Sequence, residues 1–159
     1  MEQKTLSKWL KCIIIGTGVC GLIFFFFIVP SFGQDLLVRY PEFSYCYWPW
    51  LIFLWISGIP CYTVLVLAWK IAANIGRDRS FSSENAKLFK WISYVTAVDT
   101  VFFFGGNVVL LLLNMSHPAV TLLSLIVVFV GVAVIVASAA LSHLVNKAAD
   151  LQEQSDLMI

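Results

Sequence analysis

The residues with the clearest chemical potential are polar side chains within the apolar run between Trp91 and Leu113. Asp99 lies eight residues after Trp91, which is about 12 Å along a regular helix. On a helical wheel an arc of about 100° contains Thr96, Asp99, Phe103, Gly106, Asn107 and Asn114. A carboxylate, a hydroxyl and an amide on one face can relay protons, bind a cation or anchor a polar ligand. Asp99, Thr96 and Asn107 are therefore the candidate ligand- or ion-binding residues.

An acidic side chain inside a membrane helix is costly, which makes Asp99 informative. At mid-helix a carboxylate costs about 2.5–3.5 kcal/mol on insertion scales. Because lipid offers no hydrogen-bond partners, this polar stripe must face the interior of a helix bundle. Two interpretations stay open, a functional acid and a hydrogen-bonded clamp between helices. No lysine, arginine or histidine is expected at the same depth as an ionic partner, and the nearest within reach is Lys70, at the inner end of another apolar run.

The other chemistry-bearing residues form no recognisable site in the sequence. His117 and His143 are expected near opposite membrane faces, too far apart to share one metal ion. The four cysteines show no CxxC spacing and are interpreted as small apolar side chains. The sequence contains no phosphate loop, HExxH or Rossmann fingerprint. We therefore expect no enzyme activity, no metal and no cofactor.

Four long apolar runs must position these residues. They cover about residues 12–29, 50–73, 91–113 and 120–145. Each is long enough to cross a ~30 Å hydrocarbon core as a helix. The chain is 60% hydrophobic and 12% charged, whereas soluble domains carry about 25% charged residues. The sequence predicts an all-α integral membrane protein, with residues 1–159 forming one four-helix bundle of up-down topology.

The basic residues predict the orientation of this bundle. Nine of the ten lysines and arginines lie before the first run, at the inner end of the second, between the second and third, or after the fourth, and only Arg39 does not. By the positive-inside rule, both termini, the loop 74–90 and the tail 146–159 face the cytoplasm. The first run is interpreted as an uncleaved span, because it is about 18 residues long and no A-x-A-like site follows it.

Local signals predict where the second and third helices end and begin. Ser82 is an expected N-cap with Glu84 in the first turn, so the third helix should begin near Ser83. Gly76 is an expected terminator of the second helix. Pro60 should kink the second helix, because it removes a backbone donor and crowds the preceding turn.

Other patterns concern the fourth helix and the first connection. Ser124, Gly131 and Ser138 recur every seven positions and predict a small-residue packing face. The outer loop 30–49 is rich in aromatic residues, which form either an interfacial belt or a cap over a cavity mouth. The fourth helix should continue beyond the membrane with an amphipathic pattern formed by Leu141, Leu144, Ala148 and Leu151.

Two segments on the predicted cytoplasmic side carry a resemblance. Residues 79–87 read Arg-Ser-Phe-Ser-Ser-Glu-Asn-Ala-Lys, and residues 139–148 read Ala-Ala-Leu-Ser-His-Leu-Val-Asn-Lys-Ala. Together with 151–153 and 156–159 they resemble motifs of a bacterial four-span family, the YoaS-like proteins of domain of unknown function 2975 (DUF2975). The tail departs from the family pattern at Ser155 and Met158. The resemblance implies four spans in a bacterial plasma membrane and no established activity.

Members of the resembled family often occur beside a small Cro-type helix-turn-helix regulator. This neighbourhood implies a non-enzymatic membrane sensor or anchor that engages such a regulator, although the same motifs also suffice merely to cap helices. The residues expected to contact the regulator are Phe81, Ser82, Glu84, Leu144, Leu151 and Asp156. The alternative is a small transporter, channel or immunity-type protein that uses Asp99. The other expected partners are membrane lipid and a second copy of the chain, with no direct nucleic-acid contact.

Overall fold

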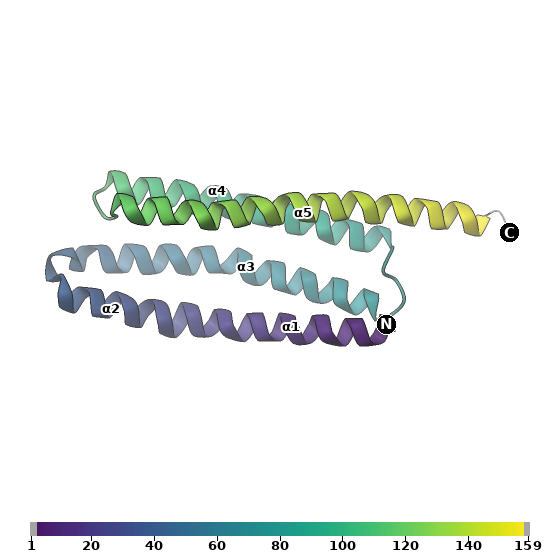
Figure 1. The fold of residues 1–159 in the computed structure, drawn as a ribbon, viewed down its shortest axis with the longest axis horizontal. Coiled ribbons are helices and arrows are strands. Elements are labelled where there is room, and N and C mark those ends of the chain that lie inside the picture. Colours follow the sequence, from purple (N-terminus) through teal and green to yellow (C-terminus); the bar gives the residue numbers. More distant parts are fainter. Residues whose placement is uncertain (1–2, 158–159) are drawn as a thin grey trace.

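Long helices account for almost all of this protein (Figure 1). The computed structural model describes residues 3–157, with side chains described as far as Ser155. A π-helical turn, η1 (Phe24–Ile28), joins the first two helices, and a 3-10 turn, η2 (Pro41–Cys46), leads into the third. The five α-helices are α1 (Gln3–Ile23), α2 (Val29–Arg39), α3 (Tyr47–Ile75), α4 (Ser83–Leu112) and α5 (Pro118–Leu157).

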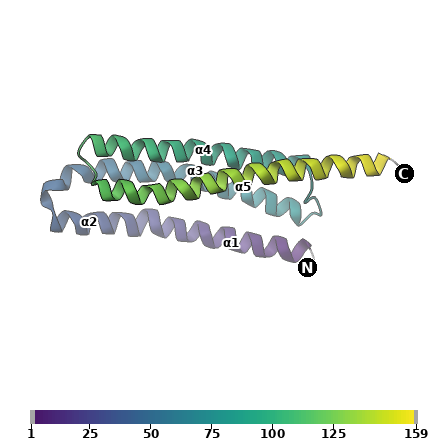
Figure 2. The ribbon, with the colours of Figure 1, turned by 45° about the horizontal axis from the view of Figure 1, so that its top comes forward.

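Four helical stretches within residues 3–157 are long and apolar enough to cross a membrane. They are Gln3–Arg39, Pro41–Ile75, Ser83–Leu112 and Pro118–Ser155. The stretches run up and down, and neighbours in the chain pack together, with α1 on α3, α3 on α4 and α4 on α5 (Figures 1 and 2). The predicted all-α four-helix bundle is confirmed.

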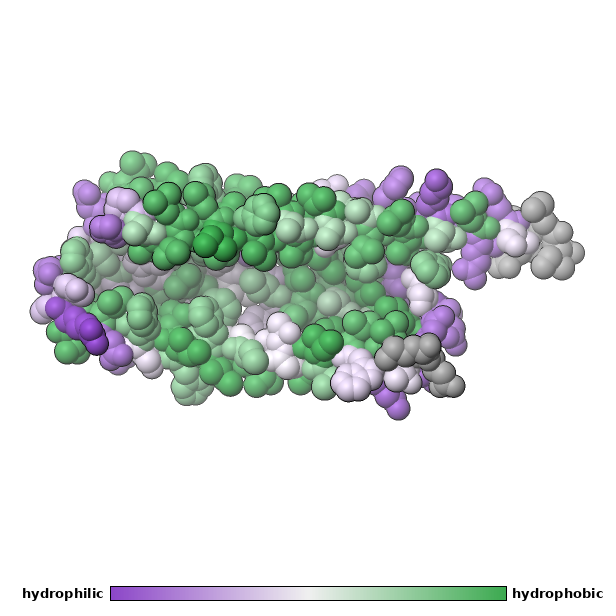
Figure 3. Space-filling model, in the orientation of Figure 1, coloured by the Kyte–Doolittle hydropathy of each residue, from purple (hydrophilic) through white to green (hydrophobic). Residues whose placement is uncertain are grey.

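The outer surface of the bundle is apolar along most of its length (Figure 3). Large apolar side chains are strongly exposed on every stretch, among them Phe27 at 69%, Ile59 at 66%, Val101 at 73% and Phe129 at 73%. Exposed apolar patches of this extent mark a membrane or partner surface. Lipid tails are as apolar as these side chains, so the surface suits the hydrocarbon core of a bilayer.

The two ends of the bundle differ in composition. Both described ends of the chain lie at the same end of the bundle as the connection 76–82, and α5 extends beyond its neighbours there (Figure 1). We call this the basic end, because nine of the ten lysines and arginines belong to the adjoining segments. The opposite end, here the aromatic end, holds η2 and the turn 113–117. His117 lies in that turn, and its Nδ1 accepts a 3.2 Å hydrogen bond from the Ala119 amide.

The segment 30–49, predicted as an outer loop, is mostly helical. Pro30 does not break the helix, because it occupies one of the first two positions of α2, where its missing N–H costs little. The wide turn η1 precedes it and disturbs the regular backbone ladder. In η1 the carbonyl of Phe25 accepts a 3.0 Å hydrogen bond from the indole of Trp55 on α3. The first stretch therefore extends without a gap to Arg39.

Aromatic side chains at the aromatic end are largely exposed, including Tyr40, Phe43 and Trp48 at 52%, 51% and 61%. Two other aromatic side chains, one from η2 and one from α3, form hydrogen bonds to the turn 113–117 between α4 and α5. The Trp50 indole donates to the Met115 carbonyl at 2.7 Å, and the Tyr45 hydroxyl donates to the Asn114 carbonyl at 3.2 Å. This end is thus held by aromatic side chains that bridge both halves of the bundle.

Small residues let α4 and α5 approach closely, as the sevenfold spacing predicts. Ser124 and Ser138 are each 6% exposed. A β-carbon at Gly131 would overlap the Thr100 side chain of α4. The hydroxyl of Ser93 crosses the same interface and donates to the Ile135 carbonyl at 3.2 Å. The predicted small-residue face is confirmed as the contact between α4 and α5.

Pro60 lies inside α3, which remains helical from Tyr47 to Ile75. The axis of α3 changes direction along its length (Figure 1), in keeping with the predicted kink. The Thr63 hydroxyl donates to the Ile59 carbonyl at 3.0 Å, which supplies a side-chain partner to the backbone beside the proline. Pro60 lies between the two residues of α3 that contact the acidic residue of α4.

Candidate functional site

Asp99 faces α3 in the middle of the bundle. The Ser57 hydroxyl donates to its Oδ1 at 3.1 Å, and the Cys61 thiol lies 3.9 Å from its Oδ2. Ser57 is buried, whereas Asp99 is half-buried. Ser57 and Cys61 are four residues apart and share one helix face on either side of Pro60. The carboxylate therefore joins α4 to α3 at the bend.

The partners of Asp99 are polar residues of α3 and not Lys70, the nearest basic residue within reach in the sequence. The two side chains that meet the carboxylate are Ser57 and Cys61. Lys70 is nine residues beyond Cys61, about 13 Å farther along α3, and its side chain is exposed near the basic end. Cys61, interpreted from the sequence as a filler, thus contacts the carboxylate.

The other members of the predicted polar stripe do not converge on Asp99. Thr96 is half-buried one turn away, and its carbonyl accepts a 2.8 Å hydrogen bond from the Thr100 hydroxyl. Asn107 is two turns away and 1% exposed, and its Nδ2 donates to the Phe103 carbonyl at 2.8 Å. Its Oδ1 is buried without a hydrogen-bond partner. Asp99 and Asn107 therefore belong to different levels of the bundle.

Asn114 is not part of the helical stripe, because α4 ends at Leu112. Asn114 has a φ of 57°, which asparagine tolerates better than most residues. Its amide donates to the Leu111 carbonyl, and the Met115 amide donates to the Leu110 carbonyl at 2.9 Å. These bonds form a Schellman motif that ends the helix.

Removing the Ser57 hydroxyl tests whether Asp99 clamps α3 to α4. Ser57→Ala should lower the free energy of unfolding in detergent by about 1 kcal/mol, because one interhelical hydrogen bond in a membrane protein is worth roughly that much. Thermal unfolding followed by circular dichroism measures the loss. Ser31→Ala, at an exposed position on α2, provides the control. Unchanged stability in Ser57→Ala would rule out the clamp.

The best-connected side chain at the basic end is Asn85 in the first turn of α4. It is 0% exposed. Its Oδ1 accepts from Asn74 Nδ2 at 2.9 Å, and its Nδ2 donates to the carbonyls of Arg79 and Ser80 at 3.0 and 3.1 Å. Its backbone amide donates to the Ser82 hydroxyl at 3.2 Å. One side chain therefore fixes the end of α3, the connection and the start of α4, and Ser82 is confirmed as the N-cap.

The connection is also tied to α1. The Ser7 hydroxyl, which is buried, donates to the Ala72 carbonyl at 2.6 Å. Gly76 packs against Ser7, because a β-carbon there would approach the Ser7 oxygen to 2.7 Å. The left-handed residue that ends the α3 turn is Asp78, with a φ of 60°, and Gly76 has a φ of −67°. Gly76 is small for packing and is the C-cap of α3, so the expectation that it terminates this helix is confirmed.

The connection and α5 enclose a hollow of about 360 Å³ at the basic end. We call it the loop–tail hollow. It brings together the two segments that the sequence analysis singled out, which lie far apart in the chain. The residues that line it include Arg79, Phe81 and Ser82 from the connection, and Ala149, Gln152 and Glu153 from α5.

Of the predicted partner-binding residues, Phe81 and Ser82 line this hollow, and Glu84, Leu144 and Leu151 do not. Phe81 is 61% exposed, and Glu84 is exposed in the first turn of α4. Leu144 and Leu151 are 61% and 58% exposed and are seven residues apart on one face of α5. The side chain of Asp156 lies outside the described residues.

Sequence reasoning missed Asn74, Asn85 and Ser57. Two asparagines eleven residues apart at the ends of successive helices are a weak signal for a hydrogen-bonded connection. Asn85 also occupies the third position after the N-cap, where a side chain can turn back toward the chain that enters the helix. Ser57 carries no such local signal, because its importance depends on which face of α3 meets α4.

Comparisons with known proteins agree with this architecture. The chain is 25% identical over 153 residues to the uncharacterized membrane protein YoaS of Bacillus subtilis (strain 168), covering 95% of this chain and 96% of that protein. No solved structure matches it. The family model described as protein of unknown function (DUF2975) matches residues 31–159. This match includes three of the four stretches and both segments around the loop–tail hollow. The chain therefore belongs to the DUF2975 family of membrane proteins.

Proposed function

We propose that this protein is a non-enzymatic anchor or sensor in a bacterial plasma membrane, with its basic end in the cytoplasm. Its ligand there is a small helix-turn-helix regulator of the kind that occurs beside members of the resembled family. The observation that carries the proposal is the loop–tail hollow, where residues 79–87 and the end of α5 meet. The orientation rests on the positive-inside rule, since nine of the ten basic residues belong to this end.

The surface around the hollow has the features of a protein-docking site. Asn85 bonds the connection to the ends of α3 and α4, so binding would not have to order it first. Phe81 offers exposed apolar area within a hollow that Arg79 and Glu153 also line, and Leu151 offers more on another face of α5. An apolar centre with a polar rim is the usual arrangement of a protein interface.

The length of α5 gives the partner something to contact beyond the bilayer. The helix continues to Leu157 and extends past the ends of α3 and α4 (Figures 1 and 2). Leu144, beside the first turn of α4, and Leu151, farther along the helix, are both exposed. Exposure of such leucines to water is unfavourable, and the apolar face of an amphipathic partner helix would bury them.

Co-purification of the regulator tests the proposal. Phe81→Ser/Leu151→Ser should reduce recovery of the co-expressed regulator at least about tenfold, since each buried side chain is worth roughly 1.5–3 kcal/mol. The matched control is Val38→Ser/Phe43→Ser, which removes two exposed apolar side chains at the aromatic end. Equal recovery with both double variants would refute the proposed surface. Recovery of a second copy of this chain in place of the regulator would assign the surface to self-association.

A second candidate function uses Asp99 as an intramembrane acid for transport. It is favoured by the half-buried position of the carboxylate and its contact with Ser57 and Cys61 at the bend of α3. A transport role requires the ionisable group, so Asp99→Asn would abolish transport of a cation into proteoliposomes. An interhelical clamp requires only a hydrogen-bond acceptor, which asparagine retains.

A further inference from the structure

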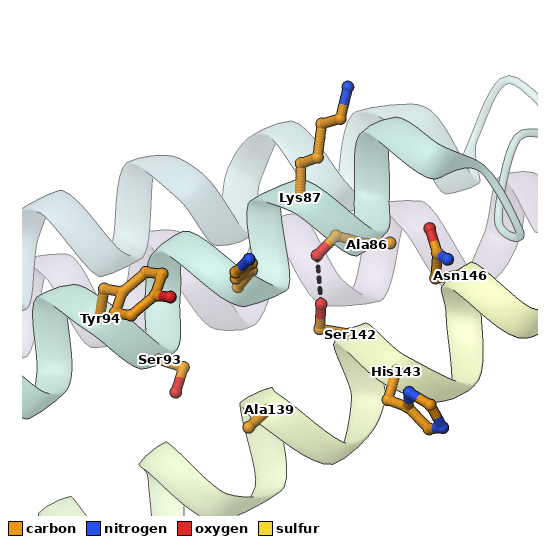
Figure 4. A pocket seen from close by; sticks show the side chains of 9 residues that line it. Ala86, Lys87, Ser93, Tyr94, Ala139, Ser142, His143 and Asn146 are labelled. Atoms are coloured by element: carbon orange, nitrogen blue, oxygen red, sulfur yellow. Dashed lines mark hydrogen bonds between the residues drawn. The ribbon is translucent and has the colours of Figure 1, made fainter.

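A second hollow lies at the basic end, between α4 and α5, with a volume of about 550 Å³. We call it the α4–α5 groove. In Figure 4, Ser93 and Ser142 project from the two helices toward the space between them, while Lys87 stands out from α4 and His143 from α5. The groove is separate from the loop–tail hollow, because the two share none of their lining residues.

The walls of the groove are held at a fixed separation. The Ser142 hydroxyl donates to the Ala86 carbonyl at 2.7 Å (Figure 4), and the Ser93 hydroxyl donates to the Ile135 carbonyl at 3.2 Å. Both bonds join α4 to α5. The space between them is therefore preformed, and a ligand that enters it need not separate the helices.

The polar groups of the groove favour an anion. Lys87, Lys90 and His143 line it, and none of its lining residues in the described structure is acidic. The Lys90 ammonium lies 5.8 Å from the centre of the Tyr94 ring, so the lysine and the phenol are neighbours. Lysine ammonium groups bind phosphate as point charges, and the tyrosine hydroxyl adds a donor.

The groove also lies where a lipid headgroup would be. Trp91 and Tyr94 flank Lys90 on α4 and are 61% and 56% exposed. Tryptophan and tyrosine concentrate at the level of the headgroups. From Val95 onward α4 continues into its apolar part, which exposes Val98 at 69% and Val101 at 73%. A phospholipid whose phosphate lies in the groove would thus have its acyl chains directly beside the apolar surface of the bundle.

We propose that the α4–α5 groove binds the phosphate of an anionic phospholipid. Basic pockets between membrane helices on the cytoplasmic side commonly hold such headgroups. Lys87 and Lys90 supply the charge, and the acyl chains lie along the exposed valines of α4. A soluble phosphate offers the same charge but gains nothing from this apolar surface, so the lipid is the ligand that fits both features.

Lipid titration followed by native mass spectrometry tests the site with full-length protein in detergent. Wild-type protein should bind phosphatidylglycerol in preference to phosphatidylcholine. Lys87→Gln/Lys90→Gln should weaken phosphatidylglycerol binding about 25-fold, at roughly fivefold for each lysine near the headgroups. The control, Lys4→Gln/Lys8→Gln, removes the same charge from exposed positions on α1 at the same end and should have a much smaller effect.

Three results would overturn the proposal. Equal losses in the two double variants would mean that binding reflects overall charge, and unchanged binding in Lys87→Gln/Lys90→Gln would mean that the groove is not the site. Displacement of phosphatidylglycerol by inorganic phosphate at equal concentration would identify a soluble phosphate as the ligand. The lipid site and the regulator surface have different residues, so failure of either leaves the other testable.

Discussion

Asn85→Ala should lower the free energy of unfolding by about 3 kcal/mol, the largest loss expected from a single polar substitution in this protein. The side chain is 0% exposed and makes three hydrogen bonds. Its removal leaves the Asn74 amide and two backbone carbonyls without that partner. Unsatisfied buried polar groups cost about 1–3 kcal/mol each, and partial access of water limits the sum.

Asn146→Ala is the matched control for Asn85→Ala, because it removes the same side chain from an exposed position. Asn146 makes one side-chain hydrogen bond, 3.4 Å long, to Asp150 on its own helix. Its replacement should change stability by no more than about 0.5 kcal/mol. Thermal unfolding in detergent, followed by circular dichroism, measures both variants. Losses of similar size would show that Asn85 does not organise the connection.

Gly106→Ala should lower the free energy of unfolding by about 2 kcal/mol, although one methyl group is the only addition. A β-carbon at Gly106 would overlap the ring of Phe53 on α3. That ring has little room to move, because Phe53 is 8% exposed and lies 5.6 Å from the Phe103 ring, measured between centroids. The Trp50 ring contacts it at 5.8 Å in an edge arrangement.

Gly105→Ala provides a control one residue away. A β-carbon at Gly105 meets no atom within 4 Å. Alanine is a better helix former than glycine, so this variant should be as stable as the wild type or more stable by up to about 1 kcal/mol. Unfolding curves of both variants in the same detergent give the comparison. A greater loss in Gly105→Ala than in Gly106→Ala would contradict the packing of α3 on α4.

The features that sequence predicted well depend on local signals. Ser82 was identifiable as an N-cap because a hydroxyl residue preceded an acidic first turn, and the α5 extension because its leucines follow a helical spacing. The seven-residue repeat of small side chains on α5 likewise predicted its contact with α4. In each case the residues that decide the structure are close together in the chain.

The features that sequence missed depend on the placement of one helix against another. Asp99 has Ser57 and Cys61 as partners because of the register and rotation of α3, which no local pattern defines. Pro30 suggested the end of a helix, yet the preceding π-helical turn places it where proline is tolerated. The role of Asn85 depends on how α3, the connection and α4 are arranged in the folded protein, because its hydrogen-bond partners lie in the first two.

We propose that the functional surface of this protein is its basic end and not the intramembrane Asp99. The most direct test is the fraction of a co-expressed helix-turn-helix regulator that sediments with membranes in cells carrying each variant. We expect Asp99→Asn to retain the regulator on the membrane and Phe81→Ser/Leu151→Ser to release it into the soluble fraction. If Asp99→Asn released the regulator from the membrane and the double variant retained it, the proposal would be wrong.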